Sequence, residues 1–68
     1  MFKKNLKSRL EKLVALVNRV DEKNYNIHSV GFHNWLAESY IDRDEEIFED
    51  YNFIDWLDFL INMYEFLV

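Results

Sequence analysis

The chain has 68 residues, half of them apolar and twelve of them aromatic, with no cysteine, no proline, one glycine and a net charge of −5. This length lies near the lower limit at which a chain buries enough surface to fold unaided, so we expect one domain over residues 1–68, stabilised by packing. The missing cysteines exclude disulfides and cysteine-based zinc sites, and a single glycine excludes a glycine-rich phosphate loop.

The charge is divided unevenly along the chain. Residues 1–37 carry seven Lys or Arg against three acids, whereas residues 38–68 carry ten acids against Arg43 alone. Anionic proteins are repelled by nucleic acid and by anionic lipid, so we expect direct binding to neither. Charged residues interrupt both the run that follows the basic start and the most apolar stretch, at residues 51–68. We therefore expect no signal peptide and no membrane span, and we expect a cytoplasmic protein.

The first predicted element is an amphipathic helix over residues 3–23. Its apolar residues follow the alternating spacing of four and three that places them on one helical face. They are Leu6, Leu10, Leu13, Val17 and Val20, with Val14 and Leu16 widening the stripe. This spacing continues for only two heptads, so the pattern favours one helix of a bundle over a coiled coil.

Residues 24–31 interrupt this period with two asparagines and the only glycine, which predicts a connection between helices. This connection contains more large apolar side chains than a loop usually has. A protein this small has few such side chains to form its core, so we do not expect it to leave them in solvent. We therefore expect Tyr25, Ile27 and Val30 to point back into the core.

A second, short helix is predicted over residues 32–41. Its apolar side chains fall on one helical face, and Ser29 precedes them as the predicted N-cap. The residues of this face are Phe32, Trp35, Leu36 and Tyr40, with Ser39 among them.

A third helical region is predicted to begin at Asp44, because negative charge is favoured at the positive end of a helix dipole. Asn52 followed three residues later by Asp55 is the pattern of a fresh N-cap. Two interpretations stay open for this region. We favour separate helices over residues 44–50 and 52–67, and the alternative is one continuous helix.

The last helix is the most apolar part of the chain and the predicted centre of the fold. At 100° per residue its polar side chains fall within about 80° of one another, and apolar side chains fill an arc of roughly 240°. The polar edge consists of Asp55, Asp58, Asn62 and Glu65. Such an arc needs neighbours on two or three sides, so we expect a compact all-α bundle of three or four helices that nearly encloses this one, or burial against a second chain.

An up-down-up order of these helices has an electrostatic consequence. The first and last helices then run parallel, which brings the basic start of the first near the acidic start of the third helical region. The gain is small, because exposed ion pairs contribute about 0–1 kcal/mol.

The sequence contains no arrangement typical of a metal or catalytic site. His28 and His33 lie about 140° apart on a helix, so they cannot share a metal ion. The run from Asp42 follows a calcium loop at first, but Ile47 and Phe53 stand where that loop requires glycine and glutamate. The serines lie in no nucleophile elbow and the carboxylates on a solvated helix edge, so we expect no enzyme, no metal and no cofactor.

Two features indicate binding to another protein. The first is an acidic series suited to imitate the phosphates of nucleic acid and to occupy a basic groove, although the same charges also serve solubility. The second is the pair Phe59 and Phe66, which flank the polar edge of the last helix as the anchors of an interface do. The acidic candidates are Asp42, Asp44, Glu45, Glu46, Glu49, Asp50, Asp55 and Asp58.

We therefore expect a stoichiometric inhibitor or neutraliser whose partner is a protein with a basic surface, such as a nucleic-acid-binding groove. Small acidic helical proteins with few glycines are frequent among phage-encoded inhibitors of host defence, antitoxins and immunity proteins, an analogy of class that rests on no motif. The alternative is a homo-oligomeric structural or regulatory module that uses the apolar face of residues 51–68 as its self-interface.

Overall fold

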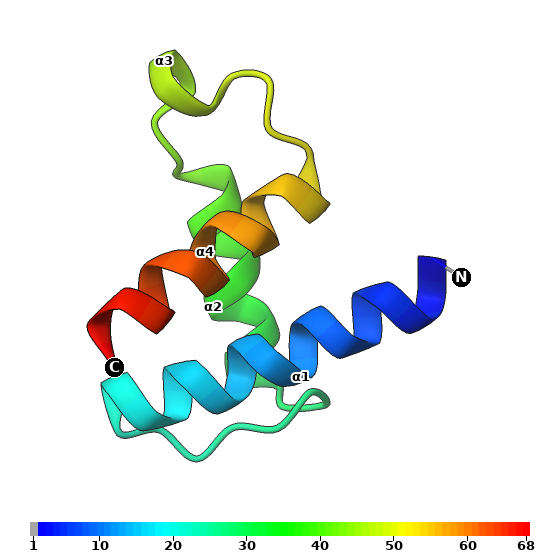
Figure 1. Cartoon of the computed structure of the whole chain (residues 1–68), viewed down its shortest axis with the longest axis vertical. Helices are drawn as coiled ribbons and strands as arrows, with labels where there is room; N and C mark the ends of the chain where they lie inside the picture. Colours follow the sequence, from blue (N-terminus) through cyan, green and yellow to red (C-terminus); the bar gives the residue numbers. More distant parts are fainter. Residues whose placement is uncertain (1) are drawn as a thin grey trace.

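The computed structural model describes residues 2–68, with side chains from Leu6 onward, as helices joined by turns (Figure 1). No strand occurs in this part of the chain, so the all-α prediction is confirmed. Its helices are α1 (Phe2–Asp21), α2 (Val30–Ile41), α3 (Glu45–Phe48) and α4 (Phe53–Leu67). The interpretation of residues 44–67 as one continuous helix is wrong, because residues 49–52 separate α3 from α4.

Helices α1 and α4 form the main packed pair and run in the same direction, with α2 crossing behind them (Figure 1). Arg9 Nε of α1 donates to Asp58 Oδ1 of α4 at 2.7 Å. One α1 turn further on, Lys12 Nζ lies 3.1 Å from Glu65 Oε2. The sequence predicted that the basic start of α1 lies near the acidic start of the third helical region, but the ion pairs of the described side chains join α1 to α4, and none involves residues 44–50. Lys3 and Lys4 also belong to that basic start, and their side chains lie outside the described residues.

The core lies where α1, α2 and α4 meet, and α4 contributes half of its buried side chains. A helix with so wide an apolar arc buries most against its two long neighbours, which explains its place at the centre. The buried residues are Leu13, Val14 and Val17 of α1, Phe32 and Leu36 of α2, and Trp56, Leu57, Leu60, Ile61 and Tyr64 of α4.

The expectation that the last helix is nearly enclosed within the chain is wrong at its C-terminal end. Phe66 is 90% exposed, Leu67 58% and Met63 39%. Helices α1 and α2 cover one side of α4, whereas α3 has only four residues and lies beyond the opposite end (Figure 1). The described chain therefore provides no cover for this outer face.

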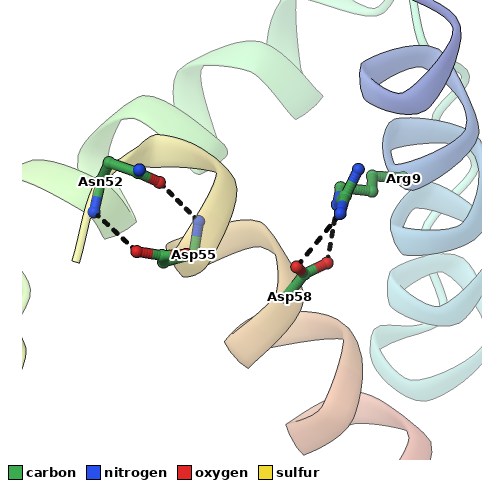
Figure 2. A network of polar contacts seen from close by, with 4 residues as sticks. All are labelled: Arg9, Asn52, Asp55 and Asp58. Atoms are coloured by element: carbon green, nitrogen blue, oxygen red, sulfur yellow. Dashed lines mark hydrogen bonds and ion pairs between the residues drawn. The ribbon is translucent and has the colours of Figure 1, made fainter. Parts of the chain in front are cut away.

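Both predicted helix starts after residue 41 are confirmed by their caps. Asn52 Oδ1 accepts from Asp55 N at 2.8 Å, and Asn52 N donates to Asp55 Oδ2 at 3.4 Å, which completes a capping box (Figure 2). Asp44 Oδ1 accepts from Glu46 N at 2.9 Å. Each cap satisfies backbone N–H groups that the first turn of a helix leaves unpaired.

The connection between α1 and α2 is fixed to α1 by one asparagine. Asn18 Nδ2 donates to Tyr25 O at 2.8 Å, and Asn18 Oδ1 accepts from Tyr25 N at 2.9 Å. Tyr25 and Ile27 pack half-buried against the core, as predicted. The prediction for Val30 is wrong, because its side chain is 73% exposed. Helix α2 begins at Val30, two residues before the predicted start, and this places Val30 about 200° around the helix from buried Phe32.

The start of α2 differs in detail from the expected cap. Ser29 occupies the N-cap position, but its hydroxyl makes no cap hydrogen bond to the helix and accepts from Asn26 N at 2.8 Å. Gly31 lies against the Tyr25 ring, where an added Cβ would stand 3.0 Å from Tyr25 Cε1. The glycine therefore allows the connection to lie close against α2.

Two part-buried polar contacts join α4 to the other long helices. Tyr64 Oη donates to Asp21 Oδ2 at 2.8 Å, and burial together with this hydrogen bond raises the pKa of Tyr64 to about 12. Trp56 Nε1 donates to Ser39 Oγ at 3.1 Å, which joins α4 to α2. Both contacts satisfy a polar group on a ring that is otherwise buried.

Candidate functional site

The acidic end comprises residues 42–50, which form α3 and the turns on either side of it. This segment stands at one extremity of the molecule, away from α1 (Figure 1). It contains one cation and six acids, and all six acids are exposed. They are Asp42, Asp44, Glu45, Glu46, Glu49 and Asp50.

Arg43 is the cation of the acidic end, and it is directed toward the protein. Its Nη1 donates to Tyr40 O at 2.6 Å, and its Nε donates to Phe48 O at 3.4 Å. The guanidinium carbon lies 4.1 Å from the centre of the Tyr40 ring. These contacts hold α3 against the end of α2 and keep the positive group half-buried.

An aromatic cluster holds the other side of the acidic end. The Phe48 ring of α3 lies 5.1 Å from Tyr51, 5.1 Å from Trp56 and 4.7 Å from Phe59, measured between ring centres. Such edge-to-face and tilted pairs add to the energy of burial. A helix of four residues has little stability of its own, so α3 depends on Phe48 and Arg43 for its position.

The carboxylates of the acidic end face solvent without a cationic partner among the side chains that the structure describes. In that part of the chain the ion pairs are Arg9 with Asp58 and Lys12 with Glu65, both between α1 and α4. The hydrogen bond to Asp58 raises the pKa of Arg9. Among the described side chains the acidic end therefore carries an excess of negative charge, and such a field attracts positive charge.

The structure divides the eight predicted acidic residues into three groups. Six gather at the acidic end, as described above. Asp55 is held by the capping box at the start of α4, whereas Asp58 points across to Arg9 of α1 (Figure 2). Asp58 is thus engaged within the fold and is partly buried, whereas the other seven acids are exposed.

The two predicted aromatic residues are not brought together. Phe59 is half-buried in the aromatic cluster, and Phe66 lies in the last turn of α4, at the end opposite α3 (Figure 1). The apolar side chains exposed beside the acids are instead Ile41, at 71%, and Ile47, at 68%. Their signal in the sequence is an isoleucine on each side of a run of four acids and one arginine. A helical wheel of the last helix does not include these positions.

The described residues contain no group of three or more His, Cys, Asp or Glu arranged to hold a metal ion. The ring of His33 is hydrogen-bonded to Ile27 O. In the same part of the chain every buried side-chain nitrogen or oxygen has a hydrogen-bond partner. An open depression lies beside the acidic end, lined by Tyr51, Asp55, Phe59 and Asn62.

Comparison with known proteins finds no matching family model, no matching curated protein and no matching solved structure. Among the described residues, no helix has the length and apolar character needed to cross a bilayer.

Proposed function

We propose that this protein is a small binding module that neutralises another protein by attaching stoichiometrically to a basic surface. The observation that carries the proposal is the acidic end, where six exposed carboxylates lie at one extremity and the arginine among them is directed inward. A basic groove that normally holds nucleic acid fits this surface, because carboxylates replace phosphates as its counter-charges. The comparison with inhibitors of host defence, antitoxins and immunity proteins is an analogy of class and rests on no motif.

The exposure of these acids supports binding over catalysis. Acid–base and nucleophilic chemistry needs groups whose pKa values are shifted by burial or by close charged neighbours, usually in a concave pocket. The acidic end stands at one extremity of the molecule, and its six carboxylates are exposed. We therefore assign it no reaction.

Exposed ion pairs contribute about 0–1 kcal/mol each, so charge alone does not provide tight binding. Complementary charge raises the association rate and selects the partner, whereas buried apolar side chains supply most of the affinity. Ile41 and Ile47 are the proposed anchors at this end, since both are largely exposed within the acidic surface.

Charge reversal at two helix C-termini tests the proposal with little risk to the fold. Asp42 and Glu49 are the C-cap residues of α2 and α3, where lysine is favoured by the helix dipole. The double variant Asp42→Lys and Glu49→Lys is compared with Glu11→Lys and Glu22→Lys, which changes the net charge equally but lies on α1 and just after it.

The binding measurement uses both double variants and the unmodified protein as baits in the source cell extract, with captured proteins identified by mass spectrometry. A partner bound by the unmodified protein and by the α1 control, but about a hundredfold more weakly by the acidic-end variant, supports the proposal. Its binding should also weaken with added salt and with competing nucleic acid. Equal capture by the two double variants contradicts it.

A homo-oligomeric module is the second candidate function, favoured by the exposed apolar face at the end of α4. Phe66, Leu67 and Met63 are side chains that a monomer usually buries. Light scattering over a hundredfold concentration range, on the unmodified protein and on Phe66→Ser, decides this candidate. Association that disappears in the variant supports it, whereas a monomer at all concentrations excludes it.

A further inference from the structure

The depression beside the acidic end has a volume of about 380 Å³, within the range of ligand sites. Asp55, Phe59 and Asn62 lie four and three residues apart, which places them on one side of α4. Tyr51, in the segment before α4, is the fourth lining residue. The backbone of a capped helix therefore fixes three of the four lining residues.

Two aromatic rings form the apolar part of the depression. The centres of the Tyr51 and Phe59 rings lie 6.3 Å apart at an interplanar angle of 88°. Phe59 is also stacked on Trp56 at 5.2 Å, so its orientation is fixed from within the fold. The faces of such rings carry negative electrostatic potential and attract cations.

The polar part of the depression offers hydrogen-bond acceptors. Asp55 Oδ2 accepts from Asn52 N, whereas Asp55 Oδ1 accepts no hydrogen bond from the described residues. The same holds for the Asn62 side-chain amide. Figure 2 shows Asp55 turned to its cap and Asp58 turned to Arg9, so Arg9 does not neutralise Asp55. A carboxylate residue and an amide residue thus line the depression together with two aromatic residues.

We propose that this depression binds one arginine side chain of the partner protein, an inference that rests on the proposed function for the source of that arginine. A guanidinium group is planar, stacks on aromatic rings and donates to two acceptors at once, whereas a lysine ammonium is a strongly hydrated point charge. The chain contains the same contact within itself, since the Arg43 guanidinium lies over the Tyr40 ring. The charge of Asp55 and the acidic end selects a cation over a neutral group.

The test is a two-dimensional NMR titration of the isotope-labelled protein with N-acetyl-L-arginine amide. The matching citrulline and lysine derivatives serve as neutral and ammonium probes. We expect saturable shifts at Tyr51, Asp55, Phe59 and Asn62, with citrulline bound at least about tenfold more weakly, because it lacks the charge that strengthens the hydrogen bonds. Shifts at other residues, or equal binding of arginine with either other probe, overturn the inference.

A single substitution at the rim gives the matched control. Asn62→Lys places an ammonium group of the chain itself in the depression without touching the core, since Asn62 is exposed. It should weaken binding of the arginine probe at least about tenfold, whereas Glu11→Gln on α1, which changes the net charge by the same unit, should leave it within twofold. Binding by Asn62→Lys within twofold of the unmodified protein overturns the inference.

The titration contains no partner protein, so its outcome is independent of the charge-reversal test. If the Asp42→Lys and Glu49→Lys variant loses partner binding but the titration shows no arginine site, only the role of the depression is overturned. If the titration shows an arginine site but the charge-reversed variant binds the partner as well as the unmodified protein does, only the proposed function is overturned.

Discussion

At the scale of single residues, a few side-chain hydrogen bonds fix how the helices of this small core are positioned. Trp56 and Tyr64 belong to α4, and each is held by a polar group of another helix. Apolar packing is non-directional, whereas a hydrogen bond requires one distance and one orientation. These two contacts therefore specify how α4 is placed against α1 and α2.

Removal of the Trp56 partner is expected to destabilise the fold measurably. Ser39→Ala leaves the indole N–H of Trp56, a residue only 6% exposed, without its acceptor, and an unsatisfied buried donor costs about 1–3 kcal/mol. Urea unfolding measures the difference. Ser8→Ala on the exposed side of α1 is the control and should change the free energy of unfolding by less than about 0.5 kcal/mol. A Ser39→Ala protein as stable as this control would contradict the assignment.

The raised pKa of Tyr64 predicts a loss of stability at alkaline pH. A tyrosine whose pKa rises from 10.0 to about 12 on folding stabilises the protein fully below pH 10, and this contribution is lost as the pH passes through about 12. The unmodified protein should therefore exceed Tyr64→Phe in stability by a constant amount below pH 10, and the difference should shrink toward pH 12. Denaturant unfolding of both proteins checks this, and a difference independent of pH would contradict it.

At the scale of elements, α4 starts where its capping box places it. Asn52→Ala should destabilise the protein by about 0.5–2 kcal/mol, because it leaves the Asp55 N–H without its side-chain acceptor. Asn62→Ala, at an exposed position within the same helix, is the control and should be neutral or slightly stabilising. Thermal melting followed by circular dichroism compares them, and equal melting temperatures would contradict the capping assignment.

Local features of the elements were predictable from the sequence, whereas contacts between elements were not. The starts of α3 and α4 follow from Asp44 and Asn52, since a cap involves residues only two or three positions apart. The pairing of Asp58 with Arg9 joins residues 49 positions apart, and only the packing of α1 on α4 determines it. A helical wheel therefore places Asp58 on a solvated edge although it faces another helix.

The candidate site likewise has local features that the sequence predicts and contacts between elements that it does not. The acidity of residues 42–50 is legible in the sequence, and so is the helix start within them. The burial of Phe59 depends on Phe48 folding back from α3, and the inward direction of Arg43 depends on carbonyl groups of two different elements. Neither contact leaves a periodic signal, so the wheel of the last helix predicts Phe59 as an anchor and omits Ile41 and Ile47.

At the scale of the whole molecule, the acids that are concentrated in the second half of the sequence lie in two different places in the structure. Two acids of α4 pair with α1, while six acids stand apart at the opposite extremity (Figure 1). The exposed apolar face at the end of α4 lies away from these acids. A partner bound by charge and a second copy bound by apolar contact would thus cover different ends of one molecule.

Hydrogen exchange with the captured partner bound tests most directly which end is the interface. Backbone amides buried at an interface exchange more slowly, and peptides spanning residues 41–53 and 63–68 report on the two ends separately. Our account predicts added protection within residues 41–53, and none within 63–68, in the partner complex. Protection confined to residues 63–68 would contradict the central claim that the acidic end binds the partner.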